Sequence, residues 1–184
     1  MAYAGRMLLG GLLGLAAFAG CEKPRPDGSW SSQRLTDALN HPKVGVRERA
    51  AQLLGEREEK EAVWPLVRTL GDREWTVRHN AVRSLGQIGD RRAAVPLIRS
   101  LKDNHWWVRV GATQALAQLK DRSVMIALIA ALRDENESVR AGAARSLGLL
   151  GDRRAIGPLR IALKDDMSRV RTSAVEALER MAAQ

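Results

Sequence analysis

The sequence predicts an all-α protein, an α-solenoid of five helical hairpins arranged in series along the chain. The first observation is a repeat, because the dipeptide Val-Arg recurs every 31 residues, at Val46, Val77, Val108, Val139 and Val170. The second is composition: 45% of the 184 residues are hydrophobic but only 4% are aromatic, so Ala and Leu must fill the core. The third is apolar spacing at the helical period within each copy. Self-similarity at a fixed period of this length is typical of stacked repeats.

Charge and cysteine content exclude several classes of protein. Lys and Arg outnumber Asp and Glu by 30 to 21, which gives a net charge of +9. The single cysteine, Cys21, excludes an internal disulfide framework, a cysteine-rich zinc module and a CxxC redox site. Stability must therefore come from helix packing.

Residues 1–20 have the layout of a signal peptide. Met1–Arg6 carries one positive charge, Met7–Phe18 is an uncharged apolar run, and Ala19-Gly20 provides a small-residue exit. At 1.5 Å per residue the apolar run covers about 18 Å, short of the roughly 30 Å hydrocarbon core. The sequence therefore predicts export rather than a permanent spanning helix.

The residues Phe18-Ala19-Gly20-Cys21 resemble the bacterial lipobox. This resemblance implies acylation of Cys21, with a fatty chain such as palmitate, and residence at the cell envelope, facing the periplasm or the exterior. Residues 21–31 then form a polar linker broken by Pro and Gly. An alternative stays open, since Ala17-Phe18-Ala19 also fits ordinary A-x-A cleavage, which would release a soluble protein.

The repeat array is predicted over residues 32–184, with copies at about 32–60, 61–91, 92–122, 123–153 and 154–184. In the third copy an apolar stripe at 95–101 predicts a first helix, and Val108, Ala112 and Leu116 predict a second. Gly89 and Gly151 suit left-handed C-caps. The next helices open at Asp caps and early prolines: Asp90, Asp121, Asp152, Pro65, Pro96 and Pro158. The two ends of the array look polar, with Thr36 where three other copies have Val or Ile, and Glu179 where three other copies have Gly.

The strings Leu-x-Asp-x-x-x-x-Val-Arg at Leu101–Arg109 and Leu-Gly-x-x-Gly-Asp-Arg-Arg-Ala-x-x-Pro-Leu at Leu85–Leu97 resemble bacterial HEAT repeats of the phycobilisome-lyase type. The resemblance implies a right-handed superhelix whose second helices line the concave face. It also implies a ladder of Asp and Arg side chains that joins neighbouring repeats. The ladder residues are Asp72, Arg78, Asp103, Arg109, Asp134, Arg140, Asp165 and Arg171, with His41 in the first copy.

Trp107 is the best candidate for a binding anchor. Its equivalents in the other copies are mostly small or polar, whereas Trp75 and Trp106 share a position that predicts packing under the adjoining repeat. Along the same outward face we expect contacts to a protein segment from six more residues: His79, Asn80, Arg83, Val110, Gln114 and Arg145. An ordinary solvated face is an equally simple interpretation.

Arginines also gather at the loops that enter the first helices. Arg91, Arg92, Arg153 and Arg154 are predicted to lie along one edge with Arg122, where anionic lipid or another polyanion could bind. A solvated rim is the alternative for such a charge run.

No catalytic constellation emerges from the sequence. Phosphate-loop and dinucleotide fingerprints are missing, the three histidines form no HE motif, and we predict no metal and no cofactor. The predicted function is a non-catalytic, lipid-anchored scaffold that binds a protein partner. Two alternatives remain, a chromophore lyase-like enzyme and a basic solenoid for polyanions or nucleic acids; predicted export argues against nucleic acid.

Overall fold

The protein is described here by a computed structural model covering residues 26–183. The predicted signal peptide and Cys21 lie outside these residues. Within them the chain forms ten α-helices, four short 3₁₀ helices and no strand, so the prediction of an all-α solenoid of five hairpins is confirmed. No helix in this part of the chain has both the length and the hydropathy that crossing a bilayer requires.

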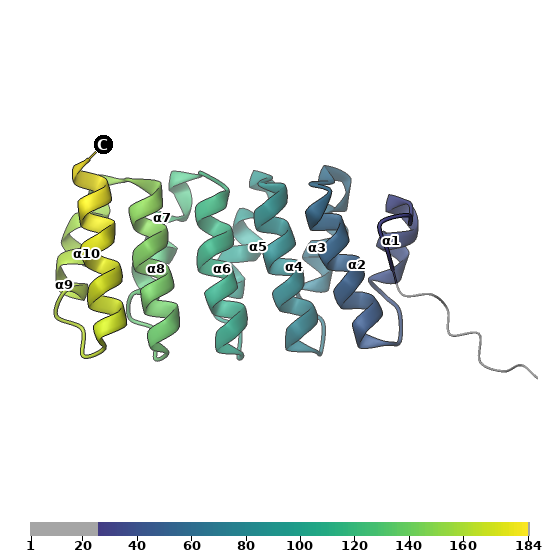
Figure 1. The fold of residues 1–184 in the computed structure, drawn as a ribbon, viewed down its shortest axis with the longest axis horizontal. Coiled ribbons are helices and arrows are strands. Elements are labelled where there is room, and N and C mark those ends of the chain that lie inside the picture. The colour runs from purple at the N-terminus through teal and green to yellow at the C-terminus, as the bar shows by residue number, and fades with distance from the viewer. Residues whose placement is uncertain (1–25, 184) are drawn as a thin grey trace, which may run out of the picture.

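The helices form two layers that run the length of the molecule (Figure 1). The first helices are α1 (Ser32–Ala38), α3 (Val63–Thr69), α5 (Ala94–Ser100), α7 (Met125–Ala131) and α9 (Ile156–Ala162). The second helices are α2 (Val44–Glu56), α4 (Trp75–Ile88), α6 (Trp106–Gln118), α8 (Glu137–Leu150) and α10 (Ser168–Ala182). Each second helix packs beside the second helix of the next repeat and against the first helix of its own.

Every junction between repeats is built in the same way. One register position takes a left-handed backbone, with φ of 67° at Gly89 and 64° at Gly151, as predicted, and 53° and 51° at Glu58 and Lys120. A 3₁₀ turn follows: η1 (Lys60–Ala62), η2 (Arg91–Ala93), η3 (Arg122–Val124) and η4 (Arg153–Ala155). The predicted aspartate caps serve these turns, since Asp90, Asp121 and Asp152 accept the backbone N–H two residues on.

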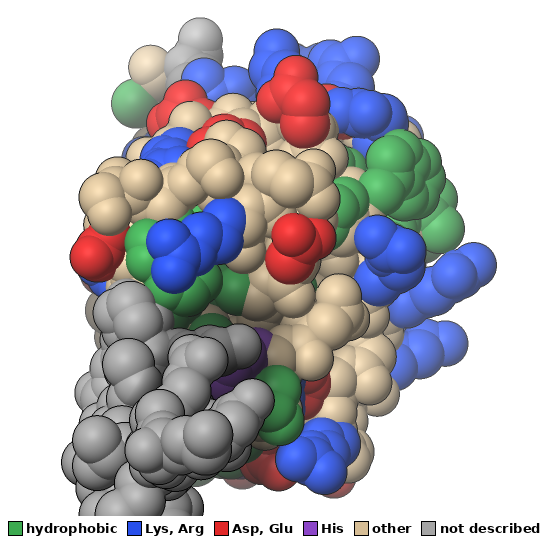
Figure 2. Space-filling model, turned by 90° about the vertical axis from the view of Figure 1, so that its right-hand side faces the viewer, with side chains coloured by type: hydrophobic (Ala, Val, Ile, Leu, Met, Phe, Trp, Pro, Cys, Tyr) green, Lys and Arg blue, Asp and Glu red, His purple; other side chains and the backbone are tan. Residues whose placement is uncertain are grey.

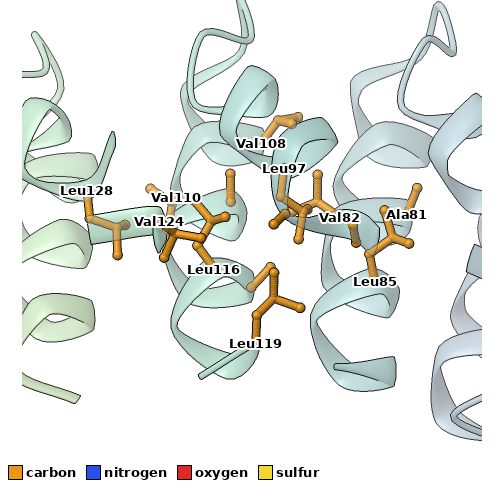
Figure 3. Close-up of a cluster of buried hydrophobic side chains, with 14 of the residues drawn as sticks. Ala81, Val82, Leu85, Leu97, Val108, Val110, Leu116, Leu119, Val124 and Leu128 are labelled. Atoms are coloured by element: carbon orange, nitrogen blue, oxygen red, sulfur yellow. The ribbon is translucent and has the colours of Figure 1, made fainter. Parts of the chain in front are cut away.

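The core lies between the layers and consists of the repeated Leu and Ala positions. Leu35, Leu66, Leu97, Leu128 and Leu159 are fully buried, as are Ala50 and its equivalents through Ala174. Figure 3 shows Leu85, Leu97 and Leu116 within one such cluster at the middle repeats. Because each hairpin buries its apolar face only against its neighbours, the stack is needed to complete the core.

The end of the predicted linker is part of the folded unit. Trp30 is half-buried against the core, and the Arg34 guanidinium lies 3.7 Å from its ring centroid. Arg57 donates to the Gly28 carbonyl at 2.9 Å. Residues 26–31 therefore pack on the first repeat.

Candidate functional site

The outer surface of the second helices carries five rings from two adjacent repeats, which we call the aromatic cluster: Trp75, His79, His105, Trp106 and Trp107. Trp75 stacks on His105 with ring centroids 4.0 Å apart and an interplanar angle of 6°. Trp106 and Trp107 meet edge to face at 4.9 Å, and His79 stacks against Trp107 at 5.6 Å. The cluster thus joins α4 to the start of α6.

The local sequence explains this arrangement. Trp75 and Trp106 open α4 and α6 in the same register, and the two helices lie side by side. His105 is the N-cap of α6, and its Nδ1 accepts the backbone N–H of Trp107 at 3.3 Å. This bond holds the histidine ring between the indoles of successive repeats.

All three indoles are open to solvent. Trp107 is 40% exposed, consistent with its proposed role as an anchor. Trp75 and Trp106, which the sequence predicts to pack under the adjoining repeat, are 37% and 39% exposed instead. The reason is that each indole lies at the very first residue of its helix, beyond the shared core, although Trp75 still covers the His105 ring.

His79 is half-buried within the cluster. Its Nδ1 lies 3.1 Å from the Trp107 carbonyl oxygen, which can only accept, so Nδ1 carries the proton. Burial lowers the pKa of His79 below 6.5, and the neighbouring Arg83 and His105 lower it further. The ring is therefore neutral at pH 7 and presents no charge to a bound partner.

The structure separates the other predicted contact residues. Arg83, Gln114 and Arg145 are exposed and share one register, so they form a polar row across α4, α6 and α8. Arg145 also donates to the Ser173 hydroxyl at 3.1 Å. Asn80 is half-buried and donates to the Thr76 carbonyl at 3.0 Å.

Val110 does not reach this surface. It is only 7% exposed and belongs to the core, because α6 packs against both α4 and α8 and buries both of its flanks. The prediction that Val110 contacts a partner is therefore wrong. The exposed residues of α6 are Trp106, Trp107, Gln114 and Gln118.

The Asp and Arg side chains form a ladder along the turns inside the hairpins. Each arginine binds the aspartate 25 residues later, in the next repeat, through two hydrogen bonds of 2.7–2.9 Å. The pairs are Arg47–Asp72, Arg78–Asp103, Arg109–Asp134 and Arg140–Asp165. Arg171 binds two backbone carbonyls and, among the described residues, no carboxylate.

The predicted arginine edge follows the junctions between repeats, and Figure 2 shows Lys and Arg side chains there with Asp and Glu among them. Arg92 and Arg154 are paired with Asp90 and Asp152 at 2.7 and 2.8 Å. Their positive charges are therefore largely compensated. Arg91, Arg122 and Arg153 are exposed, share a register with Lys60, and form no ion pair within residues 26–183.

Residues 26–183 contain no group of three or more His, Cys, Asp or Glu side chains that could hold a metal ion. The arrangement offers exposed aromatic rings and hydrogen-bonding side chains on a regular helical surface. It can bind an extended or helical segment by apolar contact and by pairing with the arginines of the row.

These features define a helical-repeat protein. The HEAT repeats family matches residues 32–117 and 94–179, so the chain belongs to this family. A search of curated proteins found no match.

Solved structures share the fold. The complex of CpcE and CpcF of phycocyanin lyase from Nostoc is 27% identical, with a TM-score of 0.75, over 89% of this chain and 70% of that one. A computationally designed armadillo repeat protein for modular peptide recognition is 21% identical, with a TM-score of 0.56, over 83% of each chain. A further engineered protein, 23% identical with a TM-score of 0.62, covers 83% of this chain and 81% of its own. The two engineered proteins support the fold alone.

Proposed function

We propose that the chain is a non-catalytic interaction scaffold that binds a protein segment on its second-helix surface. The observation that carries the proposal is the aromatic cluster, in which three indoles from adjacent repeats stay more than a third exposed. Tryptophan and arginine are enriched among the residues that contribute most of the binding energy at protein interfaces. Tryptophan in addition buries a large area at little entropic cost. Here both residue types share one surface.

The polar row sets the chemistry of the segment. Arg83 and Arg145 flank Gln114 at equal spacing, and each guanidinium favours a carboxylate partner. We therefore propose a segment with an apolar or aromatic anchor for Trp107 and acidic side chains that meet the row. Neutral His79 beside Trp107 adds no charge next to the proposed anchor at pH 7.

Affinity capture from envelope extracts tests the binding surface. We expect Trp107→Ala and Arg83→Glu to lose captured proteins that the wild type retains. The matched controls Trp64→Ala and Arg68→Glu change exposed residues of α3, in the other layer. The extracts are solubilised in detergent, so that capture reports bound proteins and not membranes. If the captured set is the same for all four variants, the proposed surface is wrong.

We further propose that the chain is exported and anchored through acylated Cys21. The support is the order of a charged start, a short apolar run and a small pair before the cysteine. Mass spectrometry of the mature N-terminus decides between the two cleavage patterns. A diacylglyceryl cysteine supports anchoring, whereas a chain that begins at Gly20 supports a released protein.

A chromophore lyase-like activity is the second candidate, favoured by the 27% identity to the phycocyanin lyase complex. Its test is whether the purified chain accelerates chromophore attachment to phycocyanin. Measurable acceleration would replace the scaffold proposal.

Binding of a polyanion is the third candidate function. It is favoured by the shared register of four basic side chains, Lys60, Arg91, Arg122 and Arg153. Steep salt dependence of DNA binding would support it.

A further inference from the structure

Helices α3, α5, α7 and α9 present a surface of unusual composition, which we call the first-helix face. Every exposed residue of these four helices is apolar, glycine or arginine. They are Trp64, Arg68, Val95, Arg99, Ile126, Ala130, Gly157, Arg160 and Ile161. None of these side chains can accept a hydrogen bond.

The apolar members are large and project into solvent. Trp64, Val95 and Ile126 occupy one register in three successive repeats and are 54%, 59% and 74% exposed, and Ile161 is 70% exposed. Single exposed apolar residues are ordinary, but a row of them across successive helices indicates a surface that is covered in use. Between α7 and α9 the face is hollowed by about 880 Å³, with Ile129, Leu132 and Ile161 in the lining.

The charged members are all positive. The turns that follow the first helices add Lys102, Arg133 and Lys164, all exposed. The next residue in each turn is an aspartate, but Asp103, Asp134 and Asp165 are held by ladder arginines of the preceding repeats. The exposed carboxylates that follow, Glu135 and Asp166, pair with two of the same arginines, Arg109 and Arg140. The view from the N-terminal end in Figure 2 shows Lys and Arg gathered around a hydrophobic group on the side where the first helices lie.

We infer that the first-helix face docks on an anionic lipid bilayer. Exposed aliphatic and indole side chains enter the boundary between headgroups and acyl chains, while arginine and lysine extend their charged ends to the phosphates. Anionic headgroups supply acceptors that the face itself lacks, and they need no fixed geometry. Nucleic acid would match the charge but would leave Ile126 and Ile161 without an apolar contact.

This orientation has a functional consequence. The second helices form the opposite layer, so the aromatic cluster stays open to a partner while the first-helix face lies on the membrane (Figure 1). The inference does not depend on the scaffold proposal or on acylation of Cys21. The test therefore uses the chain from Gly20 onward, without the apolar run at residues 7–18, and with Cys21→Ser.

Vesicle sedimentation compares phosphatidylcholine with phosphatidylcholine containing phosphatidylglycerol. We expect binding that requires the anionic lipid and falls at least about fivefold in the double variant Arg99→Glu, Lys164→Glu. The matched control is Arg169→Glu with Arg180→Glu, which makes the same change in net charge on exposed positions of α10. Circular dichroism checks that both variants melt as the wild type does.

Brominated lipids test the orientation directly, because they quench indoles that reach the bilayer. We expect Trp64→Phe to remove most of the quenching and Trp106→Phe to leave it unchanged. Equal losses in the two double variants, or quenching that survives Trp64→Phe, would overturn the inference. Binding to duplex DNA through Arg99 and Lys164 without binding to anionic vesicles would also overturn it, in favour of nucleic acid.

Discussion

Arg78 of the second repeat binds the carboxylate of Asp103 in the third through its Nε at 2.7 Å and its Nη2 at 2.8 Å. The same guanidinium donates from Nη1 to the backbone carbonyl of Asp72, in its own repeat, at 2.8 Å. One side chain therefore joins the turns of two neighbouring hairpins. In a solenoid each repeat contacts only its neighbours, so such a link acts on the interface that stability depends on.

The first prediction concerns this link. We expect Asp103→Ala to lower the free energy of unfolding by about 2–4 kcal/mol, because it leaves the buried Arg78 guanidinium without its carboxylate. Asp166→Ala is the matched control: Asp166 is 82% exposed, and its pair with Arg140 is expected to contribute less than about 1 kcal/mol. Urea unfolding measures both, and equal losses would contradict the role of the ladder.

The second prediction is a loss of stability in acid. Hydrogen bonds from Arg140 lower the pKa of Asp165 from 3.8 to about 2. For Asp103, burial raises the pKa, but hydrogen bonds from Arg78 and the His105 backbone outweigh it, so the net pKa is lowered. Groups with a lowered folded-state pKa stabilise the protein above about pH 4 and lose that contribution as the pH falls toward 2.

We therefore expect the contribution of these aspartates to the free energy of unfolding to change little from pH 7 to pH 5 and to fall steeply below pH 4. Urea titrations at pH 7, 5 and 3 measure this. Asp165→Asn removes one titrating group, so its difference from the wild type must shrink at pH 3. A difference that is constant with pH would show that the Asp165 carboxylate is not stabilised by Arg140.

The architecture could be predicted from the sequence because a strict 31-residue period fixes every register at once. The Leu and Ala positions, the left-handed glycines and the aspartate caps all follow from local chemistry repeated without insertion. Glu58 and Lys120 adopt the same left-handed backbone without being glycine, which only the shared register could indicate.

Which residues are exposed is harder to predict from the sequence than the architecture is. Periodicity marks one buried stripe on each helix, whereas a second helix in the middle of the solenoid is buried on three sides. Val110 lies off the core stripe of α6 and is still buried, since α4 and α8 cover its flanks. The first helices are only seven residues long, so two turns carry too little pattern to separate inner from outer positions. The exposed row of Trp64, Val95 and Ile126 was therefore not evident from the sequence.

The third prediction concerns the close approach of α8 and α10. A Cβ on Gly148 would lie 2.6 Å from the Cα of Ala177, which is backbone and cannot move aside without separating the helices. We expect Gly148→Ala to lower the free energy of unfolding by about 1–3 kcal/mol. Gly45→Ala is the control, because nothing lies within 4 Å of its new Cβ, and it should stabilise α2 by up to about 1 kcal/mol. Thermal melts that move in the same direction for both variants would contradict this close contact.

The fourth prediction tests the enclosure of His79. Burial lowers its pKa in the folded protein, whereas in the unfolded chain the pKa is near 6.5. As the pH falls from 7.5 to 5.5 the unfolded chain takes up this proton first, so the free energy of unfolding must decrease. His79→Gln removes that part of the slope, since glutamine can still donate to the Trp107 carbonyl but does not titrate. Urea unfolding at each pH gives the two slopes. Identical slopes would mean that His79 is open to water, and that the aromatic cluster is looser than the stacking of His79 on Trp107 indicates.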